Sequence, residues 1–200
     1  MKEFYEIHVA GLTRQLPICP LNDKLSIAGF VIFGDPELTT ACAKALNERC
    51  PEHDVLITAD LLKIAPAHDV IITAESKGIP LAHEMARQAG EHRYLLARKA
   101  TKLYMKNVFG VEVDSITTDH RQHLYLDGAD AEFMRGRNVL IVDDVISTGE
   151  SLKALEKLVT EAGGNIVGRM AILAEGDACE RKDIQFLQKL PLFHPDGTEI

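Results

Sequence analysis

The apolar residues of this chain gather in short continuous runs, and the segments between the runs change to the period of a helix. Short apolar runs bounded by turn-forming residues are typical of buried strands. On this pattern we predict strands over residues 69–74, 94–97, 139–142 and 166–173. Residues 98–113 are basic, contain glycine and follow no clean period, so no regular element is predicted there.

Between the predicted strands the pattern indicates helices. Asp35 can cap a helix whose first turn contains Pro36. The residues that follow form one apolar stripe, namely Leu38, Ala41, Cys42, Ala45 and Leu46. Further helices are predicted over residues 79–90 and 151–162. Strands joined by helical crossovers predict an α/β fold with a central, mostly parallel sheet flanked by helices, and such sheets bind ligands at the carboxyl ends of their strands.

Length, charge and cysteine content limit the classes of function. Two hundred residues, 46% of them hydrophobic, can build one buried core, so residues 1–200 are interpreted as a single domain. A formal net charge of -8 argues against nucleic-acid or anionic-membrane binding, since both need a broad basic surface. No apolar run approaches the roughly 20 residues that cross a bilayer, and no signal-peptide pattern opens the chain. We expect a soluble cytoplasmic protein with free thiols at Cys19, Cys42, Cys50 and Cys179.

The stretch VLIVDDVISTGES, residues 139–151, places Asp143 and Asp144 directly after a buried run. Adjacent carboxylates repel each other, so such a pair is usually kept where a cation or hydroxyl groups lie opposite. The turn that follows is rich in hydroxyls and glycine, and its backbone N–H groups and the helix dipole favour a phosphate. The carboxylates suit ribose hydroxyls or a hydrated Mg²⁺. A sugar phosphate would satisfy both parts of the stretch.

Three other interpretations of this stretch compete with that one. The second acidic motif of a P-loop nucleoside triphosphatase requires a GxxxxGK[ST] loop, which the chain lacks. A phospho-accepting receiver domain also contains such an acidic pair, but only residues 140–200 follow Val139, which is short for a domain. A helix that is merely capped after a buried strand explains Ser151 and leaves the two acids without partners.

The stretch resembles the phosphoribosyl-pyrophosphate (PRPP) signature of type I phosphoribosyltransferases, in which four apolar residues, two acids and two apolar residues precede a [ST]-G-x-[ST] loop. The resemblance implies that Asp143 and Asp144 contact the ribose 2′ and 3′ hydroxyls and hold Mg²⁺ indirectly, through water or PRPP. Glu150 stands where glycine or lysine is common, and we expect its side chain to point into solvent. The resemblance also implies that the 5-phosphate is bound by Ser147, Thr148, Gly149, Glu150 and Ser151.

A second loop resembles the pyrophosphate loop of the same family, [DE]-x-[RK]-G, and consists of Glu75, Ser76, Lys77 and Gly78. The resemblance implies that its amides and the catalytic Lys77 meet the leaving group. An isolated ESKG would be only a turn with an exposed lysine, but its position after a predicted strand favours a functional role. In this family the loop often contains a cis non-proline peptide, which costs about 3–4 kcal/mol, and we expect one here.

Arg98, Lys99 and Lys102 open the basic stretch and resemble the R-K-x-x-K segment at the root of a mobile catalytic loop in purine enzymes. The alternative is an exposed turn with solvated charges. A loop as long as residues 98–121 in a compact domain is typically a lid. The resemblance implies that these cations bind pyrophosphate, that the arginine serves the neighbouring subunit, and that the protein is a homodimer.

The implied reaction is transfer of the phosphoribosyl group from PRPP to a purine base, with release of pyrophosphate. Negative charge builds on the leaving group, so Mg²⁺, Lys77 and the basic stretch would stabilise it, and no covalent enzyme intermediate is required. Ser147 stands where the hypoxanthine-guanine enzymes carry an aspartate, which disfavours that class. The stretch LPICPLNDKLSIAGFVIFGDPEL resembles the hood of the adenine enzymes followed by a helix that begins at Asp-Pro, and the hood is expected over residues 1–34 and about 175–200.

Adenine is therefore the favoured base, with AMP as product. On the mobile loop the adenine enzymes carry a glutamate in an L-E-Y motif, and here Thr118 stands near that position. Asp119 beside it is a candidate catalytic proton acceptor. This departure leaves a xanthine phosphoribosyltransferase as the alternative, and a PRPP-sensing regulator that transfers nothing as a third interpretation.

Overall fold

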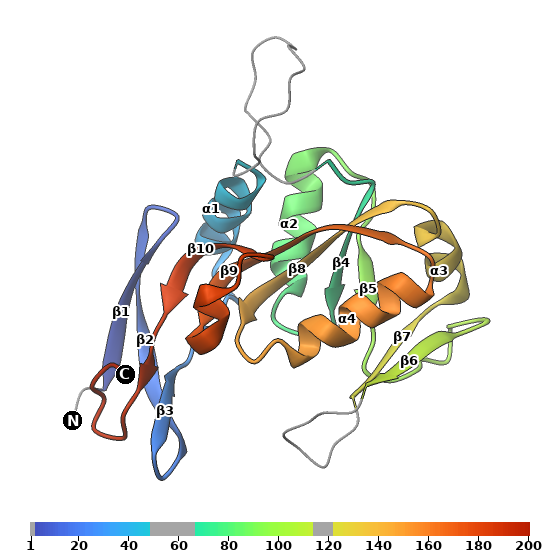
Figure 1. The fold of residues 1–200 in the computed structure, drawn as a ribbon. Coiled ribbons are helices and arrows are strands. Elements are labelled where there is room, and N and C mark those ends of the chain that lie inside the picture. The colour runs from blue at the N-terminus through green and yellow to red at the C-terminus, as the bar shows by residue number, and fades with distance from the viewer. Residues whose placement is uncertain (1–2, 49–66, 114–121) are drawn as a thin grey trace.

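The computed structural model of the protein describes residues 3–48, 67–113 and 122–200. At its centre is a five-stranded sheet in the order β10-β9-β8-β4-β5, in which all neighbours are parallel (Figure 1). All four strands expected from the apolar runs are present in it, so the predicted parallel sheet is confirmed. Its strands are β4 (Val70–Ala74), β5 (Leu95–Ala97), β8 (Asn138–Ile146), β9 (Asn165–Glu175) and β10 (Gln185–Leu190).

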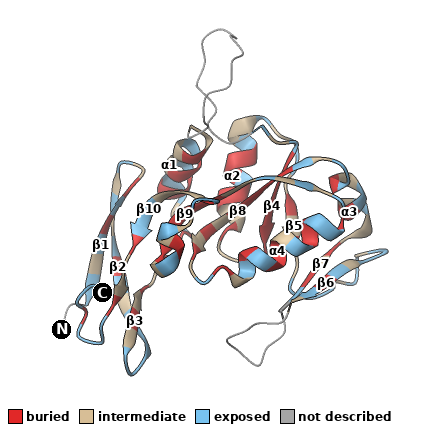
Figure 2. Ribbon diagram, in the orientation of Figure 1, coloured by how far each residue is buried: buried red, intermediate tan, exposed pale blue. Residues whose placement is uncertain are grey.

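Helices cover both faces of this sheet, as the alternating pattern predicted. α1 (Pro36–Asn47) and α2 (Ile79–Ala89) pack on one face, and α3 (Gly128–Met134) and α4 (Glu150–Glu161) pack on the other. Because side chains alternate across a strand, Ile71 of β4 packs with α1 and α2 while its neighbour Ile72 packs with α4. Figure 2 shows the resulting concentration of buried residues on the sheet and on the helix faces turned toward it.

The start of α1 and the end of α2 follow directly from their sequences. The Asp35 side chain accepts a hydrogen bond from the Leu38 N–H at 2.9 Å, and Pro36 occupies the first turn, where a missing N–H is harmless. α2 ends at Gly90, whose φ of +74° lies in the left-handed region that glycine adopts without steric penalty.

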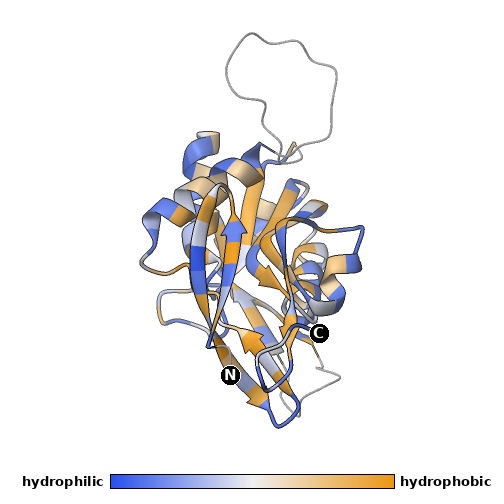
Figure 3. Cartoon of the chain, turned by 90° about the vertical axis from the view of Figure 1, so that its left-hand side faces the viewer, coloured by the Kyte–Doolittle hydropathy of each residue, from blue (hydrophilic) through white to orange (hydrophobic). Residues whose placement is uncertain are grey.

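The two ends of the described chain form a second sheet. β1 (Phe4–Val9), β2 (Leu12–Asn22), β3 (Leu25–Ala28) and β11 (Leu192–Phe193) pair antiparallel in the order β1-β2-β3-β11. Figure 3 looks onto this side of the molecule, where hydrophobic and hydrophilic residues alternate along the strands. Strands from both segments expected to form a hood therefore lie together in this sheet, and their role over a base stays a prediction. Residues 185–190 of the expected hood differ, because they form β10 at the edge of the central sheet.

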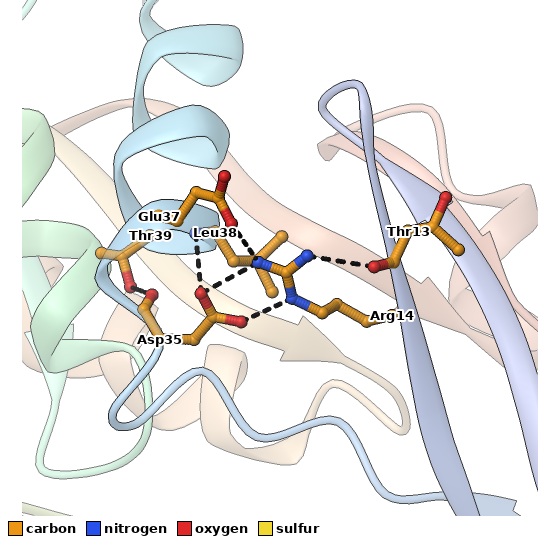
Figure 4. Close-up of polar contacts among 6 residues, drawn as sticks. All are labelled: Thr13, Arg14, Asp35, Glu37, Leu38 and Thr39. Carbon is orange, nitrogen blue, oxygen red and sulfur yellow. Dashed lines mark hydrogen bonds and ion pairs between the residues drawn. The ribbon is translucent and has the colours of Figure 1, made fainter.

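Arg14 of β2 ties this second sheet to the start of α1 (Figure 4). Its Nε donates to Asp35 Oδ2 at 2.7 Å, and its Nη2 donates to Asp35 Oδ1 at 3.1 Å and to Glu37 Oε2 at 2.9 Å. The Arg14 guanidinium holds the pKa of Asp35 below its ordinary value. Asp35 thus caps α1 and anchors β2 at once, which joins the second sheet to the start of α1.

The basic stretch after β5 differs from the expectation. β6 (Phe109–Val113) and β7 (Gln122–Leu126) form an antiparallel hairpin, so residues 109–113 of the expected mobile loop are a strand. Val111 and Leu124 are buried in the same cluster as α4, and this tertiary packing, not a local period, orders the strand. Residues 114–121 of the expected loop lie outside the described residues.

No helix in the described ranges is long and apolar enough to cross a membrane. Cys19, Cys42 and Cys179 are free thiols, as expected, while Cys50 lies outside the described residues. The short helices α3 and η1 (Gly176–Glu180) and the edge strand β10 were not predicted. In β10 Gln188 and Lys189 are exposed, so an apolar run never forms there.

Candidate active site

Two loops meet at the carboxyl edge of the central sheet, as the sequence predicted. β4 and β8 are parallel neighbours, so the segments that follow them leave the same edge side by side. Ser76 Oγ donates a hydrogen bond to Asp143 Oδ1 at 3.2 Å, and Lys77 Nζ lies 3.6 Å from Asp144 Oδ2. The acidic pair and the loop of residues 75–78 therefore form one polar cluster.

The acidic pair lies inside β8, not after it. The strand was expected to end at Val142 but continues to Ile146, because β9 stays paired beside it and places Ala171 opposite Asp143. Asp144 is only 4% exposed, and its Oδ2 accepts no hydrogen bond within the described ranges. A buried carboxylate oxygen without a donor is unfavourable, so it is suited to accept a ligand hydroxyl or a metal-bound water.

Burial also changes the acidity of Asp143. Removal from water raises the pKa of its carboxyl, and the neighbouring charge of Asp144 raises it further, to about 7. The backbone N–H of Asp144 donates to Asp143 Oδ1 at 2.9 Å and partly opposes this rise. The pair can therefore hold a proton near neutral pH, which limits the repulsion between the two acids.

Gly78 permits the close approach of the two loops. A β-carbon at this position would lie 2.7 Å from Thr73 Oγ1 and 2.9 Å from Asp143 Oδ1, so a larger residue would push the loop away from β8. On the other side Lys77 Nζ donates to the Phe30 carbonyl at 2.6 Å. Lys77 thus connects Asp144 with the segment that joins β3 to α1.

The prediction of a cis peptide in the loop of residues 75–78 is wrong, because no described residue has a cis peptide bond. The turn closes with trans peptides instead. The Ser76 N–H donates to the Ala74 carbonyl at 2.7 Å, and the Gly78 N–H donates to Ser76 Oγ at 3.3 Å.

The loop after β8, residues 147–151, offers backbone donors at the start of α4. Gly149 caps this helix with a φ of +78°, which an L side chain rarely adopts. Among the described residues, no acceptor pairs with the N–H groups of Thr148, Gly149 and Ser151. These donors and the helix dipole make the turn suitable for an anion. Glu150, expected to point into solvent, is half-buried.

Glu75 contacts the basic residues that follow the neighbouring strand β5. Arg98 Nη1 donates to Glu75 Oε1 at 2.8 Å, and Lys102 Nζ lies 3.5 Å from the same oxygen. The backbone N–H of Lys99 donates to Oε2 at 3.1 Å, while the Lys99 side chain is exposed. Arg98 holds the pKa of Glu75 below its ordinary value. Of the cations expected to bind pyrophosphate, Arg98 and Lys102 are therefore paired with an internal carboxylate in this structure.

One expected residue cannot be placed, and one further residue was missed. Asp119, the candidate proton acceptor, and its neighbour Thr118 lie outside the described residues. Arg181 was not anticipated as a site residue. It lies against the loop of residues 147–151, because a β-carbon placed on Gly149 would be only 2.8 Å from the Nη1 of Arg181. The signal was available in the topology, because Arg181 follows the strand that lies parallel to β8 and so returns to the same edge.

Comparisons of sequence place the chain among known proteins. Residues 57–191 match the family model described as "Phosphoribosyl transferase domain". A hypoxanthine/guanine phosphoribosyltransferase from Methanothrix soehngenii is 36% identical over 70 residues, which is 35% of each chain. An adenine phosphoribosyltransferase from Thermosipho africanus is 46% identical over 50 residues, 25% of this chain and 29% of that one. The matched segments span about a third of the length of these curated relatives.

A comparison of structures gives the same fold. The crystal structure of an adenine phosphoribosyltransferase from Thermoanaerobacter pseudethanolicus superimposes with a TM-score of 0.61, covering 79% of this chain and 84% of that chain. Its sequence identity is 20%, so this likeness concerns the fold alone.

Proposed function

The chain belongs to the phosphoribosyl transferase domain family, and from this premise we propose that it transfers the phosphoribosyl group of PRPP to a purine base and releases pyrophosphate. The observation that carries the proposal is the cluster of Ser76, Lys77, Asp143 and Asp144 beside the loop of residues 147–151. Within the described ranges the N–H groups of Thr148, Gly149 and Ser151 in this loop have no acceptor. The cluster and the loop together supply acceptors for sugar hydroxyls and donors for phosphates along one edge of the sheet, as a phosphorylated sugar with a charged leaving group requires.

In the proposed reaction the bond from C1′ to pyrophosphate breaks and its electron pair leaves with pyrophosphate. A ring nitrogen of the base forms the new bond at C1′ and gives its proton to a base, for which Asp119 is the candidate. Asp143 and Asp144 orient the ribose through its hydroxyls. Lys77, Arg98 and Lys102 stabilise the charge that builds on the departing pyrophosphate. To do so, Lys77 leaves its ion pair with Asp144, and Arg98 and Lys102 leave theirs with Glu75. All three then contact phosphate oxygens instead.

We include Mg²⁺ in this proposal. Within the described ranges no group of three or more His, Cys, Asp or Glu residues could hold a metal ion alone. Asp143 and Asp144 nevertheless offer carboxylate oxygens, and Asp144 Oδ2 lacks a hydrogen-bond donor. This set fits an ion held through water and substrate oxygens, as Mg²⁺ prefers. Such an ion would neutralise charge on the pyrophosphate group.

Adenine is the proposed base. Support comes from the likeness of residues 16–38 to the hood of adenine enzymes with the helix that follows it, and from curated relatives that are adenine phosphoribosyltransferases. The curated relatives also include hypoxanthine/guanine and orotate enzymes. A second candidate, xanthine, is favoured by Thr118, which stands near the position where adenine enzymes carry a glutamate.

The test measures pyrophosphate release from PRPP and Mg²⁺ with each of adenine, guanine, hypoxanthine, xanthine, uracil and orotate. Adenine-dependent release is expected. Release with xanthine alone would replace the proposed base by the second candidate. Measurable PRPP binding without release for any base would instead identify a sensor. The matched negative control is the Asp143→Asn, Asp144→Asn double variant, which should release nothing.

We also propose that the active form is a homodimer in which Arg98 acts on the neighbouring site. Support comes from Leu103 and Tyr104, which are 108% and 64% exposed close to Arg98 and Lys102, as residues covered by a partner would be. Two inactive variants, Arg98→Gln and Asp143→Asn, would be mixed after joint unfolding and refolding. Recovery of part of the activity is expected, since mixed dimers contain one site with both residues intact. No recovery in mixed dimers would place Arg98 in its own subunit's site.

A further inference from the structure

Arg181 lies at the phosphate end of the candidate site without a role in the reaction as described above. It follows the short helix η1, which continues from the carboxyl end of β9. β9 runs parallel to β8 along its whole length, with Ile146 opposite Ala174. The turn that contains Arg181 therefore returns to the edge of the sheet at which residues 147–151 begin α4.

The guanidinium of Arg181 is held in a fixed orientation. Its Nε donates to Asp183 Oδ1 at 2.9 Å, and its Nη2 donates to Asp183 Oδ2 at 2.6 Å. This bidentate contact fixes the plane of the guanidinium and leaves Nη1 unused. Among the described residues Nη1 has no hydrogen-bond acceptor, and it lies against Gly149, 2.8 Å from the position of a β-carbon.

The charge at this end of the site also requires a cation. A bound phosphate monoester would carry close to two negative charges, and Glu150 adds another negative charge in the first turn of α4. Backbone amides contribute only partial charges. Lys77, Arg98 and Lys102 are engaged at the neighbouring loop of residues 75–78 by Asp144 and Glu75.

We propose that Arg181 is a further binding residue for the 5-phosphate of PRPP, with Nη1 donating to a phosphate oxygen held by residues 147–151 and with Asp183 holding the guanidinium in place. This inference rests on the proposed function, because that function supplies the phosphate. Gly149 then has two reasons to be glycine: its left-handed backbone and the space that the guanidinium occupies above it.

The test compares two ligands that occupy different ends of the site. Ribose 5-phosphate carries the 5-phosphate, whereas Mg²⁺-pyrophosphate carries only the leaving group. Arg181→Gln is expected to weaken ribose 5-phosphate binding by about tenfold to a hundredfold, the effect of losing one charge-assisted hydrogen bond. Its affinity for Mg²⁺-pyrophosphate should stay within about twofold. In turnover, KM for PRPP should rise while kcat changes little, since the lost contact is present in ground and transition states alike.

Two variants complete the design. Arg181→Lys keeps the charge without the fixed planar donors, so it should recover part of the ribose 5-phosphate affinity and also provides a readout if Arg181→Gln does not fold. Arg169→Gln is the matched control, because Arg169 is another half-buried arginine of this region, paired with Glu156. It should leave both affinities unchanged.

The outcomes separate the two proposals. If the wild-type protein binds ribose 5-phosphate and Arg181→Gln binds it equally well, or if both ligands weaken equally, Arg181 only covers the loop and the inference is wrong. If the wild-type protein binds neither ribose 5-phosphate nor PRPP, the proposed function itself fails, and the inference fails with it.

Discussion

The two loops at the carboxyl edge of the sheet differ in whether the groups expected to bind ligand already have partners within the protein. In the loop of residues 75–78 and the adjoining basic stretch, three cations already have anionic partners: Arg98 and Lys102 pair with Glu75, and Lys77 pairs with Asp144. In the loop of residues 147–151, the N–H groups of Thr148, Gly149 and Ser151 have no acceptor among the described residues, and neither has the Nη1 of Arg181 beside them.

The loop of residues 75–78 must therefore exchange its internal ion pairs for contacts with a ligand, whereas the loop of residues 147–151 can bind a phosphate directly. The amides at the start of α4 are fixed by the backbone, so a phosphate gains their hydrogen bonds without displacing anything. A pyrophosphate group has to compete with Glu75 and Asp144 for its cations. We therefore expect the loop of residues 147–151, called the phosphate loop below, to govern the affinity for PRPP. We expect the loop of residues 75–78 to govern turnover and the release of pyrophosphate.

The acidic pair joins the two loops, and its removal should have the largest effect. Asp143→Asn with Asp144→Asn should weaken PRPP binding by about a hundredfold or more, since two hydrogen bonds to charged groups are each worth roughly 1.5–3 kcal/mol. Isothermal calorimetry with Mg²⁺ and PRPP measures the change. Asp130→Asn on α3, where the acid pairs with Arg93, is the control and should bind normally. Unchanged PRPP affinity in the double variant would remove the ribose assignment.

Lys77 should affect the rate more than the affinity for the base. Lys77→Ala is expected to lower kcat by tens of times or more, because a charge that faces the departing pyrophosphate acts mainly in the transition state. Lys77→Arg keeps the charge and should retain part of the rate. Steady-state kinetics with varied PRPP and varied base make the distinction. A loss confined to base affinity would contradict this role, and would point to the contact of Lys77 with the Phe30 carbonyl instead.

Gly149→Ala tests the preformed state of the phosphate loop. The left-handed φ of +78° should cost about 1–2 kcal/mol for a residue with a side chain, and the new β-carbon would meet Arg181. Ribose 5-phosphate binding should weaken about tenfold. Gly90→Ala is matched in backbone, with a φ of +74° and open space around it, and should lose similar stability without losing affinity. Equal affinity losses in both variants would show that only global stability was affected.

The raised pKa of Asp143 predicts the pH dependence of stability. An acid whose pKa is higher in the folded state binds more protons when folded, so stability falls as pH rises from about 4, the ordinary value, through about 7. Asp143→Asn removes this loss and should gain stability relative to wild type between pH 5 and pH 8. Urea unfolding at both pH values measures the gain. A constant difference between the two proteins across this range would contradict the raised pKa.

Four of the five strands of the central sheet and the helices α1, α2 and α4 could be predicted because their signals are local. The apolar runs at β4 and β8 and the Asp35-Pro36 start of α1 each depend on neighbouring residues alone. The second sheet is different, since Phe193 of β11 pairs with Ser26 of β3 from the opposite end of the chain. The β6–β7 hairpin likewise depends on packing with α4, for which no short window of sequence contains the information.

The same distinction applies to the site. Asp143, Asp144 and Lys77 come together because parallel strands end at one edge, which the pattern of elements already implied. Arg181 lies at that edge too, but within a stretch whose strand β10 could not be recognised. The pairing of Glu75 with Arg98 and Lys102 was not foreseen, because a motif indicates which residues meet a ligand and not what they contact before it binds.

The smallest expected effect bears most directly on the comparison between the loops. If Glu75 competes with pyrophosphate for Arg98 and Lys102, then Glu75→Gln should tighten Mg²⁺-pyrophosphate binding by a few fold and slow its release. The glutamine keeps an oxygen that can accept from Arg98 Nη1 but carries no charge. If Glu75 instead serves mainly to hold the cations in position, the same variant binds pyrophosphate more weakly. Titration of Mg²⁺-pyrophosphate, with Glu91→Gln just beyond the carboxyl end of α2 as the control, decides between a competing and a positioning carboxylate.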